Sequence, residues 1–205
     1  SVDSLASCCR LRNEMQDNTF SYTLGAGGVS TGSKGVITIN MNRLIQTAVK
    51  ESRDICEAVR EQVRDIHVYL KAWNEILKEE LKAGLLPIYN AGYISLEKQF
   101  LTIGINGYVE GCEFLGYTIS PDDENYVNFT NSVLKVIYDE NKAAKTDDLM
   151  FNTEYVPAEN LGVKNAKWDK QDGFVVPRDC YNSYFYVVED TTKPLDKFML
   201  HGSKM

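Results

Sequence analysis

A repeating pattern of apolar positions runs from Asn42 to Ala83 and predicts helical structure. Apolar side chains recur at steps of three and four, charged residues occupy the opposite side, and one longer step falls across Ser52. The stretch is long for one globular helix, so two helices bent near Glu51 to Asp54 are the alternative to a single one. Gly84 predicts the C-terminal end. The apolar positions are Ile45, Val49, Cys56, Val59, Val63, Ile66, Leu70, Trp73, Leu77 and Leu81.

Short apolar segments rich in β-branched residues alternate with the helical ones. GVITIN at 35–40 predicts a buried strand, 100–105 predicts a second, and LMFNTEYVPAENLGV predicts a third strand that runs into an ordered loop. A short helix through Cys112 follows the second strand. Ser120, with Pro next to it, predicts the start of a helix that continues to about Ala144. This order of elements predicts an α/β fold with parallel strands.

Composition and charge narrow the classes of function. The chain has 205 residues, 43% of them hydrophobic, which suffices for one globular domain with a sizeable core. A formal net charge of -7 argues against nucleic acid or an anionic membrane surface as a partner. No apolar run approaches the ~18 residues of a transmembrane helix, and no signal peptide is visible. Since the chain opens without Met and ends on LHGSKM, we expect a piece cut from a longer protein.

Five cysteines in this pattern favour a reducing compartment. Their number is odd and no CxxC occurs, which disfavours a disulfide scaffold, so a cytoplasmic location is expected. With only two histidines in the chain, a zinc site is not expected within it. Cys56 and His67 lie on or beside the apolar stripe, where packing is the expected role of both.

Two adjacent cysteines, Cys8 and Cys9, stand in SCCRL ahead of the glycine-rich run LGAGGVSTGSKG. A disulfide between neighbours closes a very small ring and distorts the peptide, so it is disfavoured. Two interpretations remain open. The thiols are buried bystanders, or a polar loop presents them to a cleft, with Arg10 helping to stabilise a thiolate.

Polar side chains at the predicted strand ends are further candidates. Asn40 ends the first strand, where the side chain serves either ligand contact or entry into the next helix. Glu154 lies in NTEYVPAEN at the exit of the third strand, with Glu159 five residues on. A carboxylate there is either a general acid/base or a solvated surface group. No Ser-His-Asp arrangement, GxGxxG motif or Walker A motif accompanies them.

Five motifs together resemble one enzyme family: SCCRL, GVITINMNRL, FLTIGINGYVEG, NTEYVPAENLGVK and VVPRDCYNSYFY. Their order and spacing are similar to the catalytic chain of anaerobic (class III) ribonucleoside-triphosphate reductases, which are glycyl radical enzymes. The resemblance runs through nearly all 205 residues. It implies an α/β barrel of two half-barrels with a finger loop threaded through the middle. On this basis 1–205 is a single partial barrel domain, with the finger loop region at 1–35 and barrel strands and helices at 36–205.

The resemblance also implies roles for individual residues. Cys9 matches the finger-loop cysteine that becomes a thiyl radical and abstracts the ribose 3′ hydrogen. TINMNR matches the family pattern TLNLPR, which gives Asn40 the position of the asparagine that contacts the ribose hydroxyls. Asn42 stands where the family has Pro. VPAEN, residues 156–160, matches the TPAES-like segment, so Glu159 is expected at the substrate.

Two departures from the family pattern concern the reductant. Formate-using members carry Met where this chain has Ser7, and they tend to carry Tyr where it has Glu154. Cys8 beside the radical site, together with the Glu154 carboxylate, resembles the branch that takes electrons from a redoxin. Glu154 is then expected to shuttle a proton at the ribose 3′ position, and a thiol pair is re-reduced by exchange. Whether Cys8 is itself a reductant or only a neighbour stays open.

The resemblance implies a larger enzyme whose N- and C-terminal parts are absent from this chain. The glycyl radical, made by an S-adenosylmethionine/iron–sulfur activase, and the zinc belong to missing parts. ATP and dNTP effectors, a ribonucleoside triphosphate substrate, a thioredoxin or glutaredoxin-type reductant and a homodimeric full-length form are also implied. The chain alone is expected to be inactive. The alternatives are another glycyl radical enzyme resembling pyruvate formate-lyase, and a non-catalytic domain derived from the barrel.

Overall fold

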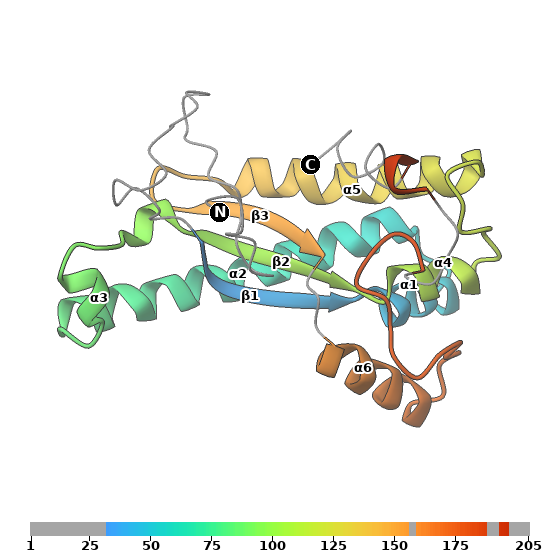
Figure 1. The fold of residues 1–205 in the computed structure, drawn as a ribbon, viewed down its shortest axis with the longest axis horizontal. Coiled ribbons are helices and arrows are strands. Elements are labelled where there is room, and N and C mark those ends of the chain that lie inside the picture. The colour runs from blue at the N-terminus through green and yellow to red at the C-terminus, as the bar shows by residue number, and fades with distance from the viewer. Residues whose placement is uncertain (1–31, 156–158, 188–192, 197–205) are drawn as a thin grey trace.

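A computed structural model describes residues 32–155, 159–187 and 193–196. Its centre is a three-stranded sheet in the order β1-β2-β3, formed by β1 (Ser33–Asn40), β2 (Phe100–Asn106) and β3 (Met150–Tyr155). Both pairs of neighbouring strands are parallel, so the predicted parallel α/β arrangement is confirmed (Figure 1). A closed barrel and a finger loop lie beyond what the described residues contain, and both stay predictions.

The long helical stretch of the sequence forms two helices, α1 (Met41–Lys50) and α2 (Ile55–Lys82). The break falls at 51–54, where Ser52 has a positive φ of 54° and the Asp54 side chain caps α2 by accepting from the Glu57 amide. The two-helix alternative is therefore the correct one. Gly84, with a φ of 77°, lies just past the C-terminal end of α2, as predicted.

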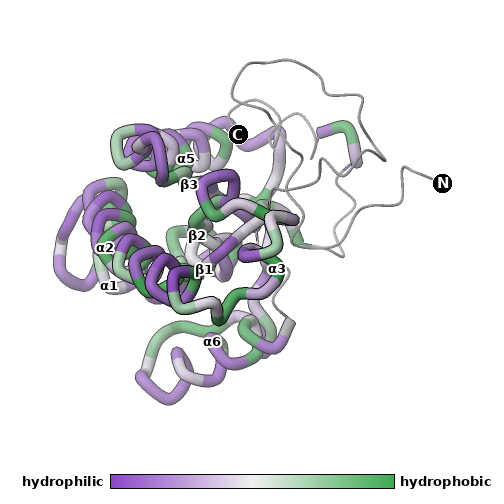
Figure 2. Tube along the Cα trace, turned by 90° about the vertical axis from the view of Figure 1, so that its left-hand side faces the viewer, coloured by the Kyte–Doolittle hydropathy of each residue, from purple (hydrophilic) through white to green (hydrophobic). Residues whose placement is uncertain are grey.

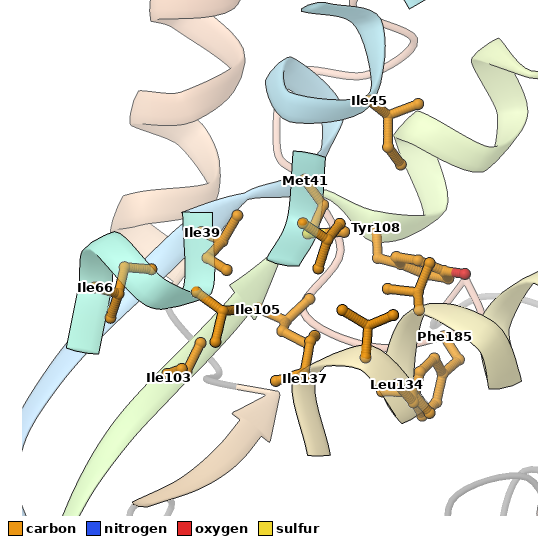
Figure 3. Close-up of a cluster of buried hydrophobic side chains, with 14 of the residues drawn as sticks. Ile39, Met41, Ile45, Ile66, Ile103, Ile105, Tyr108, Leu134, Ile137 and Phe185 are labelled. Carbon is orange, nitrogen blue, oxygen red and sulfur yellow. The ribbon is translucent and has the colours of Figure 1, made fainter. Parts of the chain in front are cut away.

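One face of the sheet is covered by α2 and by α5 (Glu124–Ala144), which lie side by side (Figure 2). Successive side chains of a strand point to opposite faces of the sheet, so every second side chain points into this layer. Ile39, Ile103 and Ile105 pack there against Ile66 of α2 and Ile137 of α5 (Figure 3). Most of the predicted apolar stripe is buried here, whereas Val49 and Trp73 lie at its edge with 43% and 42% of their surface exposed.

His67 and Cys56 have the packing roles that the sequence predicts for them. His67 is buried in α2, where its Nε2 lies 2.8 Å from Asn141 Oδ1 and its ring packs on Phe151. Cys56 is partly buried against the core.

The connections after β2 differ from the prediction at the start of one helix. Gly107, with a φ of 75°, makes a tight exit from β2 into α4 (Tyr108–Phe114). The predicted helix start at Ser120 is wrong, because α5 begins at Glu124. The Asp123 carboxylate accepts hydrogen bonds from the Asn125 and Tyr126 amides, and this cap outcompetes the serine.

A helix that the pattern did not predict follows β3. Residues expected to form an ordered loop make α6 (Glu159–Gln171), which lies beside β1 toward the carboxyl ends of the strands (Figure 1). Its buried residues are Gly162, Asn165, Ala166 and Asp169, so its inner side is small and polar rather than apolar. Hydrophobic periodicity therefore gave no signal for it.

Smaller elements complete the described fold. The excursion between α2 and β2 contains α3 (Pro87–Asn90) and the 3₁₀ turn η2 (Leu96–Lys98). None of the described helices is both long and apolar enough to cross a membrane.

Candidate functional site

The face of the sheet opposite α2 and α5 carries polar side chains in register. Across the three strands, Thr38 pairs with Gly104 and Gly104 with Glu154. One step before, Val36 pairs with Thr102 and Thr102 with Asn152, and one step beyond, Asn40 pairs with Asn106. Because side chains alternate along a strand, these positions share one face. This set of residues on β1, β2 and β3 is called the polar face below.

Glu154 lies on the polar face one residue before the end of β3. Its neighbour across the ladder is Gly104, which has no side chain, so the carboxyl is not crowded from β2. The side chain is partly buried, and burial raises the pKa of its carboxyl. A carboxyl whose pKa is moved toward neutrality exchanges protons more readily at cellular pH, which fits the general acid/base alternative.

Asn40 ends β1 on the same face and also begins α1. Its Oδ1 accepts from the Arg43 amide at 3.2 Å, so the helix-entry alternative is realised. Its Nδ2 donates to Asp169 Oδ1 at 2.9 Å. An amide side chain offers two donors and two acceptor lone pairs, so these two bonds leave one of each for another contact. Helix capping and ligand contact are therefore compatible at Asn40.

A buried carboxylate network fixes the position of Asn40. Asp169 is fully buried in α6 and accepts hydrogen bonds from Asn40, Asn42, Arg43 and Tyr181 at 2.7–3.0 Å. Asn42 is also fully buried, and Gln46 donates to its Oδ1 at 2.8 Å. The network holds α6 and the segment containing Tyr181 against the junction of β1 and α1. It also gives a structural reason for the asparagine at 42.

Asn106 performs a similar docking role at the end of β2. It is fully buried and donates to Ser183 Oγ at 3.1 Å, while Asn165 of α6 donates to its Oδ1 at 2.9 Å. Glu110 of α4 supports the same segment, because it accepts from Arg178 at 2.6 Å and from the Asn182 amide at 3.0 Å. The carboxyl ends of β1 and β2 are thus lined by a continuous hydrogen-bonded layer.

The structure brings together only part of the predicted site. Asn40 and Glu154 share the polar face, separated by two inter-strand spacings and two residues of register, about 12 Å between backbones. Cys8, Cys9 and residues 156–158 lie outside the described residues, so their predicted roles stay predictions. Glu159 is the first residue of α6.

A surface depression of about 530 Å³ lies beside the start of α5 and contains neither Asn40 nor Glu154. It is lined by Leu115, Gly116, Tyr117, Asp123, Asn125, Asn128, Phe129 and Ser132.

Asp169, Tyr181 and Asn106 were not among the site residues predicted from the sequence. For Asp169 the local signal is the spacing of Gly162, Asn165, Ala166 and Asp169, which gathers small and polar residues on one side of a helix. Within the described parts of the chain, no group of three or more His, Cys, Asp or Glu side chains is placed to hold a metal ion.

Comparisons with known proteins give one consistent family. The family model for anaerobic ribonucleoside-triphosphate reductase matches residues 1–204. A solved anaerobic ribonucleotide reductase is 30% identical, with a TM-score of 0.76 over 84% of this chain and 29% of that chain. Comparison with curated protein sequences gave no match.

Structures of the Thermotoga maritima anaerobic ribonucleotide reductase are similar as well. The one with glycerol in the active site is 30% identical, has a TM-score of 0.78, and is matched over 98% of this chain and 33% of that chain. The one in complex with dATP and CTP is 29% identical, with a TM-score of 0.73 over 82% of this chain and 29% of that chain. The chain therefore spans about a third of the length of these solved relatives.

Proposed function

The chain belongs to the anaerobic ribonucleoside-triphosphate reductase family, and from that premise we propose that it forms part of a catalytic chain that reduces ribonucleoside triphosphates to 2′-deoxyribonucleotides. The family assignment favours this activity over a pyruvate formate-lyase-like one. The observation that carries the proposal is the polar face, where Asn40 and a Glu154 of raised pKa stand at the carboxyl ends of parallel strands. Ligands of α/β sheets bind at that edge.

In the proposed reaction, Cys9 acts as a thiyl radical and takes the 3′ hydrogen of the ribose as its S–H hydrogen. Glu154 accepts the proton of the 3′ hydroxyl and returns it when the 3′ hydroxyl forms again, and the 2′ hydroxyl leaves as water with a proton from the dithiol. Two electrons from a dithiol then reduce the sugar, and Cys9 returns its hydrogen to C3′. Asn40 binds the ribose hydroxyls through the hydrogen-bond donor and acceptor that its amide has left, and Glu159 contacts the substrate. The radical chemistry requires exclusion of water and competing donors, which barrel enclosure would supply.

The remaining components follow from the same proposal. A glycyl radical elsewhere in the enzyme, made by an S-adenosylmethionine/iron–sulfur activase, supplies the unpaired electron when present. We infer a thioredoxin or glutaredoxin-type reductant because Glu154 and Cys8 accompany Cys9, and Cys8 is the candidate for the second thiol. Nucleotide effectors, zinc and a homodimer are expected for the whole enzyme, in a reducing cytoplasm. dATP and CTP are bound in the Thermotoga maritima structure. The 205-residue chain alone is expected to be inactive.

The test uses the reductase that contains this chain, activated by its own activase. Cys9→Ser is expected to abolish turnover, and Glu154→Gln to lower kcat by at least about 100-fold, the usual contribution of a positioned acid/base. Glu79→Gln, an exposed carboxylate of α2, is the control and should retain full activity. Unchanged turnover in Cys9→Ser would overturn the radical assignment, and unchanged turnover in Glu154→Gln would remove the acid/base role.

A further inference from the structure

A hydrogen-bonded pair lies next to Glu154 on the polar face. Thr102, fully buried in the central strand, pairs in the ladder with Asn152 of β3, and its Oγ1 donates to Asn152 Oδ1 at 2.8 Å. Asn152 precedes Glu154 by two residues on the same strand, so the two side chains are neighbours on one face. Thr102 therefore contacts the residue adjacent to the candidate acid/base group.

This contact occupies the Oδ1 atom of the Asn152 amide and leaves the Nδ2 donor to be accounted for. With Oδ1 facing Thr102, Nδ2 points away from Thr102, and it is buried and makes no hydrogen bond of normal length and angle among the described residues. A buried amide N–H without a partner is unfavourable, because it has lost its hydrogen bond to water and gained none. An ionised carboxylate, which only accepts hydrogen bonds, is the natural partner for such a donor.

We propose that Asn152 is a positioning residue for Glu154: Thr102 fixes the orientation of the Asn152 amide, and the amide N–H then stabilises the ionised Glu154 carboxylate. The inference rests on the proposed function, in which Glu154 is the proton acceptor of the reaction. It adds Asn152 and Thr102 to the residues that determine how that acceptor works.

The electrostatic surroundings of Glu154 support this assignment. Burial raises the pKa of its carboxyl, and the Asn152 side chain lowers it. The neighbours of Glu154 from β2 and β1 in the same row are Gly104 and Thr38, which carry no charge. α5 packs on the opposite face of β3, where Asn141 donates to Thr153 Oγ1 at 3.0 Å. The uncharged amide of Asn152 is thus the group that opposes the effect of burial on the pKa of the Glu154 carboxyl.

The test measures Glu154 directly and through turnover. In the reductase that contains this chain, an infrared titration of the carboxyl C=O band, assigned by its loss in Glu154→Gln, gives the protonation midpoint of Glu154. Asn152→Ala should move the midpoint upward by about one pH unit and Thr102→Val by about half a unit, since a hydrogen bond to the charged form is lost or weakened. Thr153→Val, the same change on the opposite face of β3, should leave it unmoved.

Turnover provides the second readout. The acidic limb of the pH profile of kcat should shift upward by the same amount in Asn152→Ala and in Thr102→Val. A moved infrared midpoint with an unmoved pH profile would support the positioning role and overturn proton acceptance by Glu154. An infrared midpoint that stays in place in both variants, or that moves equally in Thr153→Val, would overturn the positioning role.

Discussion

Asn40 and Asp169 are 129 positions apart in the chain, yet Asn40 Nδ2 donates to Asp169 Oδ1 over 2.9 Å. The contact joins the end of β1 to the inner side of α6. It ties the position of a candidate substrate-binding side chain to a helix that starts within the VPAEN motif, at Glu159. Asp169 thus connects the stability of the fold to the geometry of the proposed site.

Asp169→Ala is expected to destabilise the protein by about 3 kcal/mol, because the buried amide of Asn42 and the partly buried amide of Asn40 lose their acceptor. The free energy of unfolding from urea denaturation checks this. Asp172→Ala is the matched control. Asp172 pairs with the same arginine, Arg43, but its side chain is 54% exposed, so its removal should cost less than about 1 kcal/mol. Equal losses in the two variants would contradict the importance of the buried network.

The pH dependence of stability should report His67. Burial lowers the pKa of His67 below the ordinary value of 6.5, so the folded protein favours the neutral ring. The unfolded chain binds a proton at this histidine as the pH falls below about 6.5, and the folded chain resists doing so. The free energy of unfolding should therefore decrease as the pH is lowered from 7 toward 5.

A variant separates this effect from the general response of carboxylates to acid. His67→Gln keeps a polar partner for Asn141 but removes the titration. Urea denaturation across the same pH range should show a shallower decrease for the variant than for the wild type. Parallel curves would mean that His67 titrates alike in the folded and unfolded states.

Gly162 in α6 approaches the backbone of the following segment too closely for any side chain. An added Cβ would lie 2.8 Å from the Tyr181 carbonyl oxygen and 3.1 Å from Cys180 Sγ. Gly162→Ala is expected to lower the free energy of unfolding by about 2–3 kcal/mol, since the helix must shift away from its docking surface. Gly173→Ala is the control: its φ of 80° is strained for alanine, but nothing lies within 4 Å, so only about 1 kcal/mol is expected.

Thiol reactivity should follow burial. Burial raises the pKa of the Cys112 thiol to about 12, so it stays protonated and inaccessible at pH 8. Cys180 is exposed. Iodoacetamide labelling at pH 8 with peptide mass spectrometry should modify Cys180 and leave Cys112 intact until the protein is unfolded. Similar labelling rates at the two cysteines in the native protein would contradict the buried position of Cys112.

The local pattern of residues was enough to predict many of the helices and strands of this protein. The positions of β1, β2 and β3, the helical stretch from 42 to 83 and the parallel arrangement follow from periodicity and from the alternation of element types. The family followed from short motifs in a fixed order. These features are written in neighbouring residues, because strands and amphipathic helices each repeat over a few positions.

Other features were decided only by tertiary structure. The N-cap of α5 is Asp123 rather than Ser120, and α6 forms from a segment with little apolar periodicity. α6 is held by polar bonds from Asp169 and Asn165 to residues more than 50 positions away, and no local pattern encodes such partners. The same is true of the chemistry. The sequence singled out Asn40 and Glu154, but only the register of the sheet places Thr102 and Asn152 next to Glu154, because hydrogen bonding between strands depends on which residues meet in space.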